Sequence, residues 1–298
     1  CAGLYSDSNE AAMQRVIQHC RRIGTAKLGI QLAHAGRKAS SQRPWEGGGP
    51  LKNGQDPWPT MAPSPIPFGD GWHMPNEMNQ GDIGRVREAF VNSAQRAVRI
   101  GFDLIELHYA HGYLGHSFLS PISNKRTDNY GGSFENRTRF GRELARAVRA
   151  VVPKNIPLGV RLSAMEWKEG GITADETIAY GKALKAEGID FIDCSSGGIT
   201  ADTRNPTEPG YNVPIAERVK HEVGIPTRVV GLIVAPAHAV AIVAEGKADM
   251  IAMARSVLDD PRWGWHAAKE LGGEVARVNQ YLRVGPKLWA PAAQRARA

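Results

Sequence analysis

The sequence predicts a parallel α/β fold, in which strands and helices alternate along the chain. Short apolar runs of β type are separated by amphipathic helical runs, and this order is typical of repeated strand–helix units. Most of the apolar runs are continuous, as expected for parallel strands that helices cover. The 298 residues, of which 42% are hydrophobic and 22% charged, suit one large domain (1–298), built as a barrel or a doubly wound sheet.

Six short runs are the strand candidates, and they are spread over the whole chain. We predict strands at Lys27–Leu32, Phe102–Leu107, Leu158–Leu162, Phe191–Cys194, Arg228–Gly231 and Met250–Ala254.

Helices are expected between these strands. An apolar stripe at helical spacing runs from Ile83 to Val98 and predicts a helix that ends before Gly101. Thr173 and Glu176 form a capping-box pattern, which predicts a helix that begins there and runs to Gly188. Further helices are expected at Asn9–Ile23, Phe134–Val151, Ala235–Glu245 and Pro261–Leu271.

The segment 39–80 breaks this alternation. It is rich in Pro, Gly and Trp and has no clear period. A loop of this length inside a compact domain is usually functional. Because it follows the carboxyl end of a strand, where barrels carry their active sites, we expect it to cover the active-site face.

Charge and cysteine content narrow the classes of function. The net charge is +7, but Lys and Arg are scattered among nearly as many acids and no basic run with interleaved aromatics occurs. This favours a solvated surface and an anionic cofactor over nucleic-acid binding. The three cysteines, Cys1, Cys20 and Cys194, form no disulfide framework and no CxxC pair, which fits a reducing cytosol.

The hydropathy of the chain and the residues at its amino end indicate where the protein is located. No apolar stretch reaches the roughly 20 residues that a membrane span needs, and nothing at the amino end has the pattern of a signal peptide. We therefore expect a cytoplasmic protein with no membrane partner. The first residue is Cys1 and not Met, so we do not expect it to be a translational start.

The strongest candidates for catalysis directly follow the strand Phe102–Leu107. His108 and His111 are three residues apart and could bind one oxygen atom together, while the phenol of Tyr113 could donate a proton. One alternative is a turn in which the histidines cap neighbouring backbone groups. Another is a metal site completed by His116, but no carboxylate or further His stands at a comparable strand end, and we expect no metal.

Gln31 is a candidate for cofactor binding. It lies within or at the tip of a predicted strand, where its amide offers a donor and an acceptor to the edge of a heterocycle. His34, Arg37 and Lys38 add positive charge beside it. The alternative is a glutamine inside the barrel that pairs with its neighbours.

Arg161 is a second candidate, because it lies in the middle of an apolar strand. A buried cation needs an anion or several acceptors, since burying an unpaired charge is prohibitive. A cofactor would satisfy this need, and so would a structural ion pair with Glu106 or Asp193. The residues alone do not decide between the two.

The last two strands end in small residues. Gly231 is the last residue of one of them, Ala254 is the last residue of the other, and Arg255 directly follows Ala254. Barrels often build a phosphate site from these two loops. Small residues let backbone N–H groups approach an anion, which Arg255 could clamp. Many unrelated phosphate-binding barrels share this spacing.

Five blocks of the chain, taken together, resemble the old yellow enzyme family, and in particular its bacterial branch of xenobiotic reductases, enoate reductases and NADPH dehydrogenases. The blocks are LGIQLAHAGRKAS, FDLIELHYAHGYLGHSFLSPISNKRTDNYGGSFENRTRF, GVRLSA, IDFIDCSSGG and ADMIAMARSVLDDPRW. They occur in uninterrupted order over nearly the whole chain, and the second block is highly specific.

The resemblance implies an FMN-dependent ene-reductase on an eight-stranded TIM barrel of the FMN-linked oxidoreductase type. NAD(P)H would deliver a hydride to the flavin, which would pass it to the β-carbon of an α,β-unsaturated carbonyl or nitro compound. By motif, His108 and His111 would bind the substrate oxygen and Tyr113 would protonate the α-carbon.

The resemblance also implies the cofactor contacts. Gln31 would contact the pyrimidine ring of the flavin and Arg161 its N1–C2 edge. The phosphate would be bound by Gly231, Ala254 and Arg255. Near the end of the chain, Arg283 matches a tail residue that reaches the active site of a neighbouring subunit, which implies a homo-oligomer, a dimer or tetramer.

The chain departs from the family pattern in two places. Ala254 stands where relatives often have Gly, and two strand–helix units of the family precede the residues that match Leu4–Ile23. We therefore expect a trimmed part of a longer protein, with about six of the eight strands in barrel order, a gap, and one cavity shared by Gln31, Arg161 and Arg255. Alternatives are a non-catalytic fragment that cannot hold flavin and a related dienoyl-type reductase.

Overall fold

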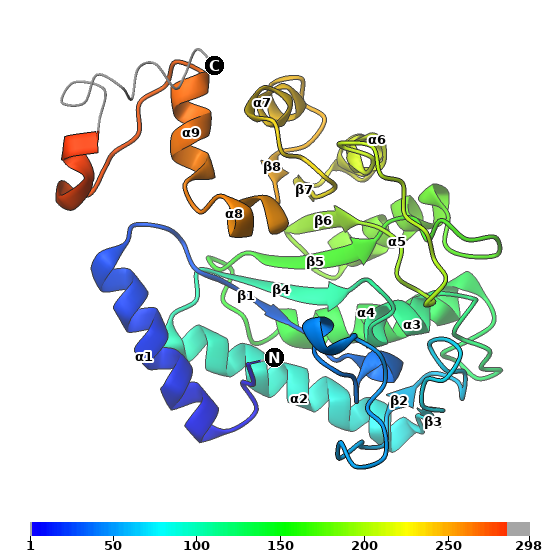
Figure 1. Ribbon diagram of the computed structural model, residues 1–298. Helices are drawn as coiled ribbons and strands as arrows, with labels where there is room; N and C mark the ends of the chain where they lie inside the picture. Colours follow the sequence, from blue (N-terminus) through cyan, green and yellow to red (C-terminus); the bar gives the residue numbers. More distant parts are fainter. Residues whose placement is uncertain (1, 285–298) are drawn as a thin grey trace.

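Six parallel strands form one open sheet in the computed structural model, which describes residues 2–284. The hydrogen-bonded order within that range is β1-β4-β5-β6-β7-β8 (Figure 1). The strands are β1 (Gly29–Leu32), β4 (Leu104–Tyr109), β5 (Leu158–Ser163), β6 (Phe191–Ser195), β7 (Thr227–Val229) and β8 (Met250–Ile251). This confirms six strands in barrel order, and the architecture is a partial (β/α) barrel with β1 and β8 as its edges.

The central strands of this sheet are almost fully buried. Strand β6 is buried along its whole length, and β4 and β5 each contain one half-buried residue. In β5 that residue is Arg161, which is therefore the most accessible side chain of its strand. Continuous apolar strands of this kind pack helices on their outer face, in agreement with the pattern that the sequence shows.

Three of the predicted carboxyl ends of strands are wrong by two residues or more, and those of β5 and β6 by one. Strand β4 continues through His108 and Tyr109, which pair in register with Arg161 and Leu162, so His108 lies in the strand and not after it. Strands β7 and β8 end earlier than predicted. Gly231 adopts a φ of +151° and Ala254 a ψ of −75°, and neither conformation continues a strand.

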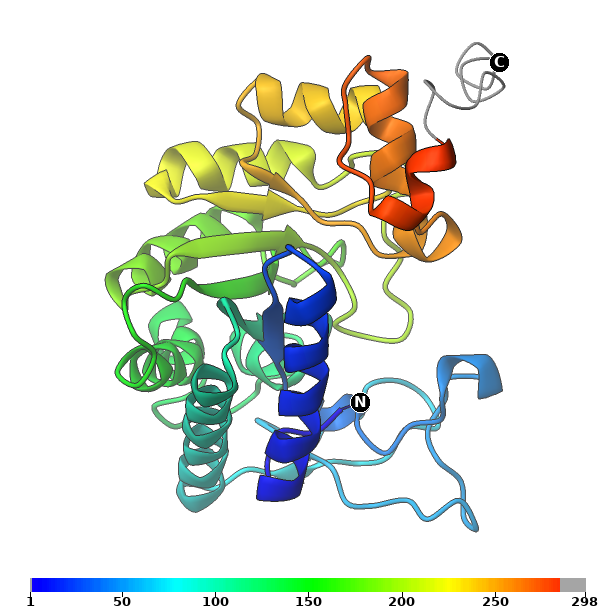
Figure 2. The same cartoon turned by 90° about the vertical axis from the view of Figure 1, so that its left-hand side faces the viewer.

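Helices connect consecutive strands and cover the outside of the sheet. Those that the sequence predicts are α1 (Asp7–Ile23), α2 (Gln80–Ile100), α4 (Phe134–Arg149), α5 (Ala174–Ala186), α7 (Pro236–Ala244) and α9 (Trp263–Glu270). The predicted capping box of α5 is present, with the Thr173 side chain accepting from the N–H of Glu176. Figure 2 shows α1 beside α2, and the two helices contact each other.

Several short helices have no counterpart in the prediction. They are α3 (Leu114–Leu119), α6 (Val213–Val219), α8 (Arg255–Asp259), a π-helical turn (Lys220–Gly224) and a 3₁₀ segment (Asn279–Val284). The six residues of α3 are all buried, so the helix has no polar face and its sequence shows no amphipathic period.

The segment 39–80 is mostly irregular and lies on the side toward which β1 and β4 point (Figure 1). It contains a 3₁₀ turn (Pro44–Glu46) and two very short parallel strands, β2 (Met61–Ala62) and β3 (Asn76–Glu77). A further 3₁₀ turn (Gly36–Lys38) precedes it. The two strands have only two residues each, which is too short for a period to be visible in the sequence.

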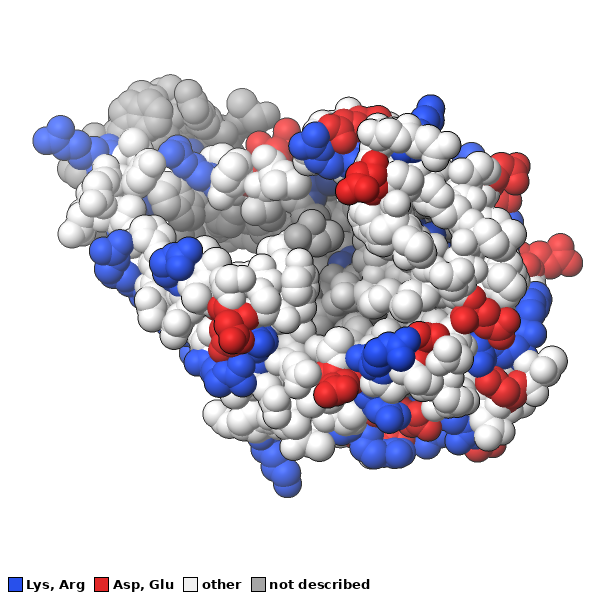
Figure 3. Space-filling view, turned by 90° about the horizontal axis from the view of Figure 1, so that it is seen from below, with Lys and Arg blue, Asp and Glu red and all other residues white. Residues whose placement is uncertain are grey.

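Charges of both signs are intermixed on the face of the molecule in Figure 3, where Lys and Arg side chains lie among Asp and Glu. This agrees with the scattered charges of the sequence. Among residues 2–284, no helix combines the length and the apolar character that crossing a bilayer requires.

Candidate active site

A cavity of about 530 Å³ lies at the carboxyl ends of the sheet strands. This is the end at which barrels carry catalysis, and the volume is within the range of ligand pockets. Five of the predicted site residues line it: His111, Arg161, Gly231, Ala254 and Arg255. The cavity therefore brings together residues that follow or belong to β4, β5, β7 and β8.

Four predicted site residues do not line this cavity. Gln31 lies on β1, and His108 and Tyr113 lie on and after β4, next to His111. Arg283 is exposed in the last 3₁₀ segment. The predicted convergence on one cavity thus holds for Arg161 and Arg255 but not for Gln31, whose amide donates to Glu106 on the neighbouring strand.

The rings of His108, His111 and Tyr113 form a contiguous group. The His108 and His111 rings are 5.2 Å apart between centroids and nearly perpendicular, at 88°. The Tyr113 ring lies 4.7 Å from the His108 ring. Two imidazoles at this separation can approach one small polar atom from two directions, with a phenol at their side.

Both imidazoles are held neutral. Burial, with the nearby charge of Arg161, lowers the pKa of His108 to about 3 and that of His111 to about 2. The backbone N–H of Ala110 donates to Nδ1 of His108 at 3.1 Å, which leaves the proton of the neutral ring on Nε2. His108 is therefore a neutral hydrogen-bond donor through Nε2.

The backbone of the loop that carries His111 is strained and held from several sides. His111 has a φ of +57° and Gly112 a φ of +75°, which is the left-handed region. A non-glycine residue in that region costs of order 1–3 kcal/mol, so surrounding contacts must fix it. The Ser163 hydroxyl accepts from the His111 N–H at 2.9 Å, and Nζ of Lys38 donates to the His111 carbonyl at 2.9 Å.

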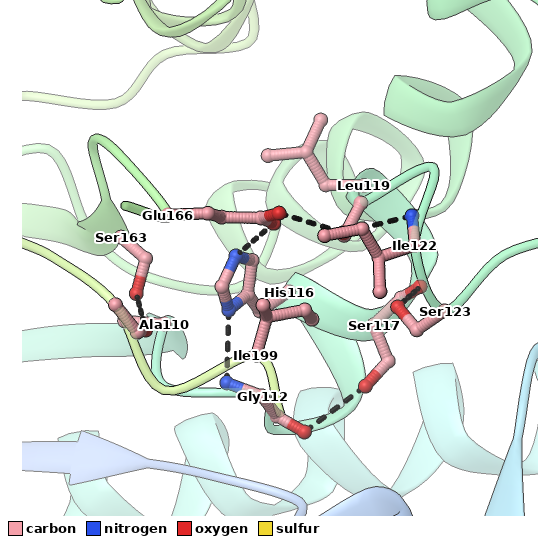
Figure 4. A network of polar contacts seen from close by, with 12 residues as sticks. Ala110, Gly112, His116, Ser117, Leu119, Ile122, Ser123, Ser163, Glu166 and Ile199 are labelled. Carbon is pink, nitrogen blue, oxygen red and sulfur yellow. Dashed lines mark hydrogen bonds and ion pairs between the residues drawn. The ribbon is translucent and has the colours of Figure 1, made fainter. Parts of the chain in front are cut away.

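Helix α3 holds the other side of this loop, as Figure 4 shows. Nδ1 of His116 accepts from the Gly112 N–H at 2.8 Å, and the Ser117 hydroxyl donates to the Gly112 carbonyl at 3.0 Å. Nε2 of His116 lies 2.8 Å from a Glu166 carboxylate oxygen, and both side chains are fully buried. Burial opposes ionisation of Glu166, but its contacts with His116 and Ser120 prevail and hold its pKa below the usual value.

This network also bears on the metal alternative. Both nitrogens of His116 are engaged, one by the Gly112 backbone and the other by Glu166, so His116 does not turn toward His108 and His111. Within residues 2–284, no group of three or more potential ligands among His, Cys, Asp and Glu is placed to hold a metal ion.

Arg161 forms a loose ion pair with Asp193, one of the two acids considered as its structural partners, but no hydrogen bond to it. Its Nε lies 3.8 Å from Oδ2 of Asp193, beyond hydrogen-bonding distance, and that Nε has no hydrogen-bond partner. Arg228 instead bonds both carboxylates, Glu106 and Asp193. Glu106 in turn accepts from the Gln31 amide at 2.6 Å.

The lining of the cavity fits FMN. The buried Nε of Arg161 and the buried hydroxyl of Ser196 have no partner in the protein, and both residues line the cavity. Buried polar groups are almost always hydrogen-bonded, so this pair indicates a polar ligand. Gly231 and Arg255 lie at another part of the same cavity, where a phosphate could be held by backbone N–H groups and a guanidinium.

Several residues of the site were not predicted from the sequence. They are Ser163, Glu166, Ser195 and Arg228. Nε2 of His111 lies 2.7 Å from Oγ of Ser195, although the two are 84 residues apart. For Ser195 a signal was present, since it directly follows the predicted strand that ends at Cys194, as His108 follows the predicted strand that ends at Leu107. For Glu166 the sequence shows no such signal, because this residue lies in a loop with no periodic pattern.

Known proteins resemble this chain along most of its length. The profile of the NADH:flavin oxidoreductase / NADH oxidase family matches residues 1–274. An NADPH dehydrogenase from Geobacillus sp. (strain WCH70) is 42% identical over 281 residues, covering 94% of this chain and 77% of the relative.

Solved structures show the same fold. Morphinone reductase in complex with tetrahydroNAD is 26% identical with a TM-score of 0.69, over 92% of this chain and 74% of the other. A 2-naphthoyl-CoA reductase in complex with 2-naphthoyl-CoA is 26% identical with a TM-score of 0.74, over 87% of this chain and 40% of the other.

Proposed function

The chain belongs to the NADH:flavin oxidoreductase / NADH oxidase family, and we propose that within this family it is an ene-reductase. Its substrates would be α,β-unsaturated carbonyl or nitro compounds. The protein is an NAD(P)H-dependent flavin oxidoreductase whose cofactor is FMN. When bound, FMN supplies two-electron chemistry, accepting a hydride from NAD(P)H and passing it to the substrate.

The observation that carries this proposal is the pair of neutral imidazoles beside a phenol. An activated double bond accumulates negative charge on its carbonyl or nitro oxygen as a hydride arrives at the β-carbon. His108 and His111 would hold that oxygen by hydrogen bonds, and their rings are 5.2 Å apart at the cavity end of β4. Losing one such donor typically costs about 3 kcal/mol, or 10²–10³ in rate.

Tyr113 would supply the proton that the α-carbon needs. Its ring lies 4.7 Å from His108, and Nζ of Lys38 lies 5.7 Å from its ring centroid. Burial, with the neighbouring charge of Arg37, lowers the pKa of Lys38 to about 8, so the ammonium is still the main form at neutral pH.

The cofactor contacts in this proposal follow the cavity lining. Arg161 would lie at the N1–C2 edge of the flavin, where its unpartnered Nε finds an acceptor. Gln31 would contact the pyrimidine ring. Its Nε2 donates to Glu106, which leaves its amide oxygen available to accept a hydrogen bond from the ring. Gly231, Ala254 and Arg255 would bind the phosphate.

We also propose that segment 39–80 covers the active-site face. Arg37, just before it, donates to the carbonyls of Ile66 and Pro67 in the segment and to that of Ile199 after β6. The N–H of Ala201 donates to the carbonyl of Phe68 at 3.1 Å. The segment is thus tied to the loop that follows β6, beside the cavity.

Two further parts of the proposal concern the assembly and the compartment. Arg283 is exposed, which is compatible with a role in the active site of a neighbouring subunit in a dimer or tetramer. We place the enzyme in the cytoplasm, where NAD(P)H is available. Sedimentation of the FMN-loaded protein would give the oligomeric state, and an Arg283→Ala variant would show whether a partner contributes to activity.

The decisive experiment is an anaerobic assay of the two half-reactions. The protein is loaded with FMN, reduced with NADPH labelled with deuterium at the hydride position, and mixed with cyclohex-2-enone. We expect the flavin absorbance to fall and then recover, and the product to be the saturated ketone with deuterium at the β-carbon. Flavin that is reduced by NADPH but not reoxidised by the enone or by a nitroalkene would contradict an ene-reductase.

A further inference from the structure

Arg228 and Asp193 belong to a charged cluster in the interior of the sheet, and neither has a role in the function proposed so far. We propose that Arg228 is a positioning residue that tunes the redox potential of the FMN by binding the two carboxylates that would otherwise neutralise Arg161. The proposal rests on the FMN site described above, but it does not depend on the substrate class.

Arg228 lies on β7 and bridges two buried acids. Its Nε and Nη2 donate to Oδ2 of Asp193, at 2.9 and 2.6 Å, and its Nη2 also bonds the carboxylate of Glu106 on β4. Glu106 and Asp193 are 3% and 1% exposed, so water does not solvate them and Arg228 is their main counter-charge. The two acids outweigh burial and raise the pKa of Arg228 above its usual value.

The position of Arg161 follows from this bridge. In register, Asp193 has Arg161 on one side and Arg228 on the other. Arg228 takes the shared oxygen Oδ2, whereas Nε of Arg161 stays 3.8 Å from it without a hydrogen bond. Arg228 bonds Oδ2 of Asp193, while Oδ1 of Asp193 has no hydrogen-bond partner. Arg161 therefore keeps only a loose ion pair with Asp193, and its guanidinium lines the cavity.

The net charge of the cluster then decides how well the site holds a reduced flavin. Burial and the charge of Asp193 raise the pKa of Glu106, whereas Arg228 opposes that rise. At about pH 8, with Glu106, Asp193, Arg161 and Arg228 all ionised, the charges cancel. Reduction adds negative charge to the FMN ring, which a nearby cation stabilises. Without Arg228 the cluster would carry one net negative charge, and Asp193 would draw Arg161 away from the ring. The reduced flavin would lose affinity relative to the oxidised flavin.

The main test is the midpoint potential of the bound FMN in an Arg228→Met variant, measured at about pH 8 against a reference dye. We expect the affinity of the protein for reduced FMN, relative to its affinity for oxidised FMN, to fall about tenfold. This corresponds to a midpoint potential about 30 mV lower for a two-electron couple. The Glu106→Gln, Arg228→Met double variant restores the charge balance and should return toward the wild-type potential. Arg218→Met, which removes an exposed ion-paired arginine on α6, is the matched control and should leave the potential unchanged.

Arg228→Met leaves two buried acids without their main counter-charge, and this loss can prevent folding. A second variant, Glu106→Gln, therefore tests the proposal independently. Glu106→Gln keeps Arg228 and gives the cluster one net positive charge, so the potential should rise. A potential that is unchanged in Arg228→Met, or in Glu106→Gln if only that variant folds, would overturn the proposal. Failure of the ene-reductase function would be seen separately, as normal potentials without reduction of the enone.

Discussion

Nε2 of His111 and Oγ of Ser195 are 2.7 Å apart, and this contact joins the loop after β4 to the end of β6 at the rim of the cavity. A histidine that is held at Nε2 by a hydroxyl presents only Nδ1 to a ligand. If Ser195 donates to Nε2, the proton of the neutral ring lies on Nδ1, and His111 becomes a donor to the substrate oxygen.

The first prediction therefore concerns Ser195→Ala. Loss of the hydroxyl removes the contact that selects the tautomer, and one hydrogen bond is typically worth about 0.5–1.5 kcal/mol. We expect a phenol, which offers one oxygen as an activated carbonyl does, to bind about threefold to tenfold more weakly. Titration of the FMN absorbance with the phenol measures this. Unchanged affinity would mean that Ser195 does not orient His111.

The second prediction concerns the two imidazoles themselves. His108→Ala and His111→Ala should each weaken phenol binding at least tenfold and slow enone reduction by about 10²–10³, since each variant removes one donor to the oxygen. FMN should remain bound. Phenol dissociation constants, with FMN content as the control, test the assignment. Wild-type phenol affinity in both variants would refute it.

Tyr113→Phe separates the two half-reactions. Only the reduction of the double bond needs a donated proton, so that half-reaction should slow by about 10²–10⁴ while the reduction of FMN by NAD(P)H keeps its rate. Stopped-flow measurement of each half-reaction is the appropriate assay. An equal loss in both would identify Tyr113 as structural.

A fourth prediction follows from the buried histidines. In the folded protein burial keeps the pKa of His108 at about 3 and that of His111 at about 2, and it lowers the pKa of His34 as well. The unfolded chain takes up protons at these sites near pH 6.5 and the folded chain does not. The free energy of unfolding should thus fall as the pH falls below about 6.5, by up to about 1.4 kcal/mol per pH unit for each histidine.

Urea unfolding of wild type and His108→Gln at about pH 7, 6 and 5 checks this expectation. The variant removes one of the titrating groups, so its stability should depend less steeply on pH than that of wild type. Parallel stability curves would show that His108 is accessible to protons in the folded state.

Much of the fold can be predicted from the sequence because its pattern is periodic. Continuous apolar runs and the Thr173 capping box predict the strand order and helix α5 well. The ends of β7 and β8 cannot be predicted this way, since Gly231 and Ala254 leave β geometry to line a cavity. Composition gives no signal for such a local change of backbone.

The candidate site, like the fold, can be predicted from the sequence only in part. Strand ends locate His111 and Arg255, because the carboxyl ends of parallel strands meet. Arg161 is found instead as a cation in the middle of an apolar strand. The partner of a charge is harder to predict, because it depends on register between distant strands. Asp193 has an arginine on each side in the sheet, and only the structure shows that Arg228 and not Arg161 bonds it.

The left-handed backbone at His111 restricts which residues evolution or an engineer can place there. Asn is among the few side chains that tolerate a φ of +57° and that also carry a neutral N–H donor. β-Branched and bulky aliphatic residues would strain the turn, and Asp would meet the substrate oxygen with a like charge. His111→Asn is thus the substitution most compatible with both the backbone conformation and the hydrogen-bonding role. In a random library at position 111, only a few residue types should give active enzyme.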